Sequence, residues 1–123
     1  MSKPKSGPGF VYLMHATGTD LYKIGLSANP IKRLYKLNGE SPYEIKILHT
    51  IFVDSMLIAE GYFHRIFGAK RIKNEWFRLD SYDVSVFCKC NGKNEDELIL
   101  EVAVKQGFYQ NRDANSYRKN GNK

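Results

Sequence analysis

Apolar and polar residues alternate in some segments of the chain and recur at helical spacing in others, and this pattern predicts the elements. Strand-forming residues fill 10–14 and 21–24 on either side of a small, polar stretch, which predicts a β-hairpin. Gly25 is expected to end the second strand, where a neighbouring backbone or a ligand comes close. Alternation over 44–52 predicts a third strand, and 75–79 is expected to form a short final one.

Capping signals mark the first helix. Asn29 provides an N-cap, and Pro30 follows at the first helical position, where its missing N–H costs nothing. The helix is expected over 30–38, with Gly39 as its stop. Its expected core stripe is Ile31, Leu34 and Leu37, and the cations on its flanks and opposite face are Lys32, Arg33 and Lys36.

The second helix carries two polar side chains on one face. It is expected to follow a cap at Asp54 or Ser55 and to run to about residue 67, because apolar residues recur there at helical spacing. Glu60 and His64 lie four positions apart and should therefore share a face.

The later segments complete the fold class. Residues 70–73 are expected to form a basic turn, 81–90 fits a strand or a helix, and Asn94 caps a terminal helix to about residue 106. Trp76 and Phe77 are both expected in the core, closing the sheet over the second helix. The predicted class is α/β (α+β): a small mixed, mostly antiparallel three- to four-stranded sheet flanked by helices.

Length and charge predict one domain with two basic ends. A chain of 123 residues has room for a single core, expected over 10–109. The polar and basic segments 1–9 and 110–123 are expected to be flexible. The net charge of +6 favours polyanionic partners such as nucleic acid, although charge alone does not identify one.

The two cysteines bear on the compartment. Cys88 and Cys90 are too close in sequence to join distant segments, and neither a signal peptide nor a membrane-spanning apolar run is visible. We therefore expect a reducing, intracellular compartment and no membrane partner. Because no second Cys or His cluster accompanies them, both cysteines are expected to be small, half-buried residues rather than zinc ligands.

Five short motifs follow one another along the chain: Phe10-Val11-Tyr12, Lys23-Ile24-Gly25, Arg33 in the following helix, Glu60-x-x-x-His64, and Asn74-Glu75-Trp76-Phe77. This ordered set resembles the GIY-YIG nuclease superfamily, particularly its short phage-associated branch. Lys23 follows Tyr12 by 11 positions and Arg33 follows Lys23 by 10, spacings typical of that family.

The resemblance implies a DNA endonuclease, in the cytoplasm of a bacterial or phage-infected cell, that uses a single Mg²⁺ or Mn²⁺ ion. By position, Glu60 would be the only direct protein ligand of the metal, which suits an ion that keeps several waters. Arg33 would donate to the phosphate as it gains charge. Tyr12 would orient or deprotonate the attacking water.

The chain departs from the superfamily name at Lys23, which replaces the second motif's tyrosine; Tyr22 precedes it and would point to the opposite strand face. A neutral Lys23 could accept a proton, and a charged one could bind phosphate. Equally, the change could mark a noncatalytic DNA-binding module on the same fold. Asn74 or Glu75 would supply the family's polar support for the site.

Each candidate also has a purely structural explanation. Tyr12 is a good strand residue, and Arg33 could belong to a solvated helix face. Glu60 and His64 could form an ordinary pair worth about a few tenths of a kcal/mol. For His64 alone, a structural and a catalytic role are equally favoured. The joint occurrence of the motifs, in the right order and elements, favours the nuclease.

Further cations are expected to contact nucleic acid, namely Lys32, Lys36, Arg71 and Lys73. Phosphate contacts of this kind position a protein on DNA but do not read its sequence. Without a separate DNA-recognition domain, we expect the chain to cut with little sequence preference, or to rely on a homodimer or a separate partner.

Overall fold

A single antiparallel sheet organises the protein. The structure, a computed structural model, describes residues 7–106. Strand β1 (Gly9–Ala16) lies inside the sheet and pairs with β2 (Leu21–Ser27) on one side and with β3 (Ile45–Val53) on the other. The predicted hairpin and third strand are confirmed. The prediction that Gly25 ends its strand is wrong, because β2 continues to Ser27.

Two short strands extend the sheet beyond β2. Strands β5 (Trp76–Arg78) and β4 (Arg71–Lys73) give the order β3-β1-β2-β5-β4. The sheet therefore has five strands rather than three or four. The basic turn expected at 70–73 is wrong: the 3₁₀ turn η2 (Gly68–Lys70) precedes a paired strand. Asn74, at φ 55°, takes the left-handed conformation that lets the chain turn back within two residues.

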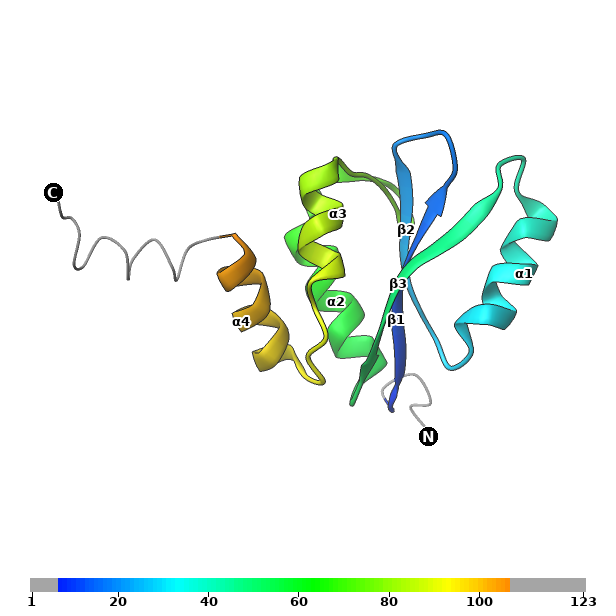
Figure 1. Ribbon diagram of the computed structural model, residues 1–123. Helices are drawn as coiled ribbons and strands as arrows, with labels where there is room; N and C mark the ends of the chain where they lie inside the picture. The colour runs from blue at the N-terminus through cyan, green and yellow to red at the C-terminus, as the bar shows by residue number, and fades with distance from the viewer. Residues whose placement is uncertain (1–6, 107–123) are drawn as a thin grey trace, which may run out of the picture.

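Four helices cover the two faces of the sheet. They are α1 (Pro30–Glu40), α2 (Met56–Ile66), α3 (Ser81–Cys88) and α4 (Glu95–Lys105). Helix α1 lies alone on one side of the sheet, and the other three lie on the opposite side (Figure 1). The expected N-caps Asn29, Ser55 and Asn94 are confirmed, because each side chain accepts a backbone N–H of its helix. The ambiguous segment 81–90 is mainly helical.

The end of α1 differs from its prediction. The helix passes through Gly39, so this glycine is not the stop. Termination falls at Ser41, which is extended (φ −101°, ψ 141°), as expected for the residue before a proline. Ile31 is 55% exposed, so its predicted place in the core stripe is wrong, whereas Leu34 and Leu37 pack against the sheet.

Alternation along β1 separates two apolar layers. Val11 and Leu13 belong to the larger core, which also contains α2, α3 and α4 residues. Tyr12 and Met14 belong to a smaller cluster under α1. The same alternation corrects the placement of Trp76: only Phe77 lies in the larger core, and Trp76 packs in the α1 cluster.

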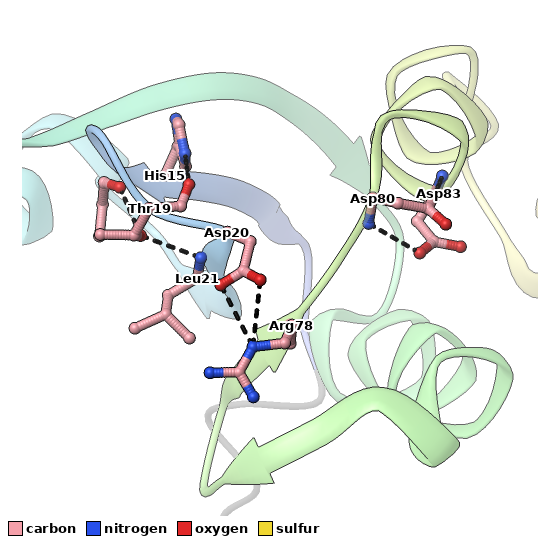
Figure 2. A network of polar contacts seen from close by, with 8 residues as sticks. His15, Thr19, Asp20, Leu21, Arg78, Asp80 and Asp83 are labelled. Atoms are coloured by element: carbon pink, nitrogen blue, oxygen red, sulfur yellow. Dashed lines mark hydrogen bonds and ion pairs between the residues drawn. The ribbon is translucent and has the colours of Figure 1, made fainter.

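Polar contacts tie the β1–β2 loop to β5 (Figure 2). The Arg78 guanidinium donates to both carboxylate oxygens of Asp20 at 3.1 and 3.2 Å. Within the loop, His15 Nε2 donates to the Thr19 carbonyl, and Thr19 Oγ1 accepts from the Leu21 N–H. Exposed ion pairs of this kind contribute little free energy, so the contacts mainly fix where β5 docks on β2.

The cysteines occupy ordinary packing positions. Cys88 is half-buried, as expected, but Cys90 is fully buried, and burial raises the pKa of its thiol to about 12. Within residues 7–106, no group of three or more His, Cys, Asp or Glu side chains is arranged to hold a metal ion. No helix in that range is long and apolar enough to cross a membrane.

The domain boundaries are described only in part. Most of the flexible segment expected at 1–9, and all of the tail expected at 110–123, lie outside the described residues. Gly7 already contacts the domain, because its carbonyl accepts a hydrogen bond from the Met56 N–H at 3.0 Å, and Gly9 begins β1.

Candidate active site

The Tyr12 hydroxyl is the centre of the candidate site. Tyr12 is fully buried and lies opposite Gly25 in the β1–β2 pairing. A Cβ atom on Gly25 would lie 2.4 Å from Tyr12 Oη and 2.9 Å from Glu75 Oε1. The close approach predicted at Gly25 is therefore real, but side chains make it. Glycine is needed there so that the hydroxyl and the carboxylate can converge over β2.

The electrostatics of Tyr12 show which groups surround its hydroxyl. The pKa of Tyr12 is raised to about 12, first by burial and then by the Glu75 carboxylate, with a smaller contribution from Glu60. Arg33 acts in the opposite direction through its charge and its approach to the hydroxyl. That approach does not reach the geometry of a formed hydrogen bond, and Oη has no such partner within residues 7–106. The phenol therefore stays protonated near neutral pH.

Lys23 lies beside Tyr12 on the face that α1 covers. Its cross-strand partner Met14 belongs to the α1 cluster, and Tyr22 packs on the opposite face, as predicted. Lys23 Nζ lies 2.8 Å from Glu75 Oε1 and 5.7 Å from the centroid of the Trp76 ring. Only 12% of the Lys23 side chain is exposed, so this ion pair is screened less than a surface pair.

Glu60 and His64 approach β2 from the other side of the sheet. His64 Nε2 donates to the Ile24 carbonyl at 2.9 Å, and its ring meets Phe77 edge-on. The Glu60 Oε2 atom lies 3.9 Å from His64 Nε2, which confirms that the two side chains share a face. Because the carbonyl oxygen only accepts, Nε2 carries a proton, and His64 holds α2 against β2.

The edge of β2 is open beyond its pairing with β5. Strand β5 pairs with β2 only from Leu21 to Lys23, and one further bond joins the Ile24 N–H to the Glu75 carbonyl. Beyond that point, residues 25–27 have no strand on this side within the described chain. The charge of Glu60, on α2, acts on Tyr12, although the Tyr12 side chain belongs to the α1 cluster on the other side of the sheet.

A cationic hollow lies at the first turn of α1. It encloses about 360 Å³ and is lined by Ser27, Ala28, Asn29, Lys32, Arg33 and Lys36. The partial positive charge at the start of the helix adds to the three cations. None of the three forms an ion pair with a carboxylate within residues 7–106. The hollow can therefore bind an anion such as a phosphate group.

Of the four other predicted residues, Arg71, Lys73, Asn74 and Glu75, only Glu75 reaches the site. Arg71 and Lys73 are exposed on the edge strand β4, away from the cationic hollow, whose lining they do not join. Asn74 makes the turn into β5, and Glu75 is the member of the pair that reaches the cluster. Sequence reasoning missed the contact of Trp76 with Lys23. The alternation of residues 75–79 was the signal for this contact, since it places Trp76 on the other face of the strand from Phe77.

Comparison with known protein families identifies the family of this chain. A model of the T5orf172 domain matches residues 9–92, which is more than half of the chain and includes all five strands and the candidate site. The chain therefore belongs to the T5orf172 domain family, which is related to the GIY-YIG nucleases. No curated protein and no solved structure matches the chain significantly.

Proposed function

We propose that this member of the T5orf172 domain family is a metal-dependent DNA endonuclease that hydrolyses a phosphodiester bond with a single divalent metal ion. One observation carries the proposal: the buried Tyr12 hydroxyl converges with the Glu75 carboxylate at Gly25, and the charges of Glu60 and of Arg33, which lines the cationic hollow, also act on it. An ordinary surface would not place a buried hydroxyl, two carboxylates and a guanidinium together in this way.

The donor set near Tyr12 suits Mg²⁺ or Mn²⁺. Carboxylate oxygens are the ligands these ions prefer, and Mg²⁺ is commonly bound through one or two carboxylates while it keeps several waters. Glu60 is 13% exposed, and the absence of a side chain at Gly25 lets the Tyr12 hydroxyl and the Glu75 carboxylate occupy the space over β2. Glu60 would hold the metal, and Glu75 is the other carboxylate whose charge acts on Tyr12. When bound, the ion would neutralise charge on the scissile phosphate and lower the pKa of water.

The other residues have distinct tasks in this mechanism. Arg33 donates to the phosphate oxygens as they gain charge, since it borders the cationic hollow and also approaches Tyr12. Tyr12, protonated at neutral pH, orients the attacking water through its hydroxyl rather than removing its proton. Lys23 pairs with Glu75 and binds phosphate when that carboxylate turns away.

His64 is a positioning residue in this proposal. Its ring nitrogen holds the Ile24 carbonyl, one residue before Gly25, and Glu60 is one helical turn away. Loss of the ring would shift Glu60 relative to Tyr12 without removing any group from the reaction.

The second candidate function is noncatalytic DNA binding on the same fold. The Lys23–Glu75 pair favours it, because Lys23 replaces a tyrosine of the family motif and is already engaged by a carboxylate. Under this alternative, Lys32, Arg33, Lys36 and the β4 cations supply phosphate contacts alone. In either case, DNA is the partner, and sequence preference would come from a homodimer or a separate recognition protein.

Plasmid cleavage separates the two functions. Supercoiled plasmid is incubated with the protein in Mg²⁺, in Mn²⁺ and in EDTA, and nicked or linear product is expected only with metal. Glu60→Gln should abolish product while DNA affinity in EDTA is retained. Glu95→Gln is the matched control, because Glu95 pairs with Arg65 on the surface. Absence of metal-dependent product on plasmid, single-stranded and branched DNA would leave the binding module as the function.

A further inference from the structure

A second, apolar hollow lies on the same sheet face as the candidate site. It encloses about 420 Å³ between α1, the loop that follows it, and β4. Its principal lining residues are Leu21, Leu37, Tyr43, Ile72, Lys73 and Trp76. This volume lies within the range of small-molecule sites, which are typically apolar and carry a few polar groups.

The apolar hollow adjoins the reacting region through Trp76. The Trp76 ring lines the hollow, and Lys23 Nζ lies 5.7 Å from the centroid of that ring. Lys23 is in turn bonded to Glu75, whose carboxylate acts on Tyr12. On α1, Leu37 lines the hollow and Arg33, one turn earlier, lines the cationic hollow, so a single helix borders both.

Aromatic and aliphatic side chains are exposed at this hollow. Tyr43 is 47% exposed and Ile72 is 48% exposed, and both border it. Lys73 stands at its rim, so a chain of phosphates that enters the cationic hollow would meet positive charge on this side too. One carboxylate, Glu40, also borders the hollow and could accept a hydrogen bond from an amino group.

We propose that the apolar hollow binds an unpaired nucleobase of the nucleic-acid strand whose phosphate is held at Arg33. This proposal takes one premise from the proposed function, namely that the bound polyanion is DNA. A flat base with a π face fits an aromatic platform flanked by cations, and stacking of this kind is tolerant of sequence. The paired bases of a duplex are stacked on each other and cannot enter, so the hollow favours single-stranded or distorted DNA.

Trp76 reports directly on this hollow, because it is the only tryptophan in the chain. The protein is titrated in EDTA, so that no cleavage is needed, with a single-stranded oligonucleotide and with a spacer oligomer of equal charge that lacks bases. We expect the oligonucleotide to quench Trp76 fluorescence and to bind about 5- to 150-fold more tightly than the spacer, as stacking of one base would give. Equal affinity with no quenching by the oligonucleotide would overturn the proposal.

A pair of matched variants locates the effect. Tyr43→Ala should reduce the affinity ratio between the oligonucleotide and the spacer by about 5-fold or more, with little change for the spacer. Tyr82→Ala is the control, because Tyr82 is 48% exposed on α3, on the other side of the sheet. An equal loss in both variants would refute the assignment of the base to this hollow. Quenching without plasmid cleavage would sustain the base site while removing the nuclease.

Discussion

Tyr12→Phe should stabilise the fold while it abolishes the proposed DNA cleavage. The substitution removes only the hydroxyl and leaves the ring in its fully buried position, so the apolar packing of the α1 cluster is retained. Oη has no formed hydrogen bond within residues 7–106. A buried polar atom without a partner costs about 1–3 kcal/mol. The approach of Arg33 offsets part of that cost, so the expected gain is about 1 kcal/mol.

Thermal unfolding followed by circular dichroism measures this gain. For a domain of this size, about 1 kcal/mol corresponds to a rise in Tm of roughly 4–8 °C. Plasmid cleavage by the same variant should fall about 10²-fold or more, because the proposed mechanism needs this hydroxyl to orient the water. Tyr62→Phe is the control: Tyr62 is also buried, but it belongs to the larger core and should leave cleavage unchanged.

The opposite stability result would refute this reasoning. If Tyr12→Phe lowers the free energy of unfolding by about 1 kcal/mol or more, the hydroxyl has a good hydrogen-bond partner in the folded protein. A variant that is more stable and fully active would instead show that the hydroxyl takes no part in the reaction.

Two further predictions concern the same cluster. Gly25→Ala should lower the free energy of unfolding by about 1–3 kcal/mol and impair cleavage, since its Cβ would meet the Tyr12 hydroxyl and Glu75. The control Gly39→Ala, whose Cβ has no neighbour within 4 Å, should retain activity and raise the free energy of unfolding by up to about 1 kcal/mol. Equal effects of the two variants in denaturant unfolding would contradict this prediction. Burial and Glu75 raise the pKa of Tyr12 from 10.0 to about 12. The stabilisation linked to the protonated phenol is therefore complete below pH 10, and it is lost as the pH rises through about 12. Glu75→Gln should therefore lower the pKa of Tyr12 in an ultraviolet titration, and an unchanged phenol titration would place Glu75 away from the hydroxyl.

The sequence predicted correctly those features that depend only on residues a few positions apart. Asn29, Ser55 and Asn94 each cap a helix because a side-chain oxygen can reach a backbone N–H two or three residues ahead, whatever the rest of the chain does. The shared face of Glu60 and His64 follows from helical spacing alone. The three caps and the shared face of the Glu60–His64 pair could therefore be predicted from the sequence.

Tertiary contacts decided the features that the sequence did not predict. Gly25 and Gly39 both look like stops, but β2 continues through Gly25 because β1 supplies its hydrogen bonds, and α1 continues through Gly39 until Pro42 constrains the preceding residue. The segment 71–73 has no apolar alternation strong enough to predict a strand, and it becomes one only because β5 offers a partner. The pairing of β5 with β2 and β4 also decides which of its side chains face α1 and which face the larger core.

The turn between β4 and β5 ties three features of the site to one register. Asn74 accepts a left-handed conformation at low cost, which places Glu75 at the end of the turn, where its carboxylate meets Lys23. The next residue, Trp76, then faces α1 and lines the apolar hollow, and Phe77 faces the larger core. A shift of β5 by one residue would exchange the faces of Trp76 and Phe77, burying the indole in the wrong layer and removing the carboxylate from Tyr12. The turn, the Lys23 ion pair and the apolar hollow are therefore constrained together by one short segment.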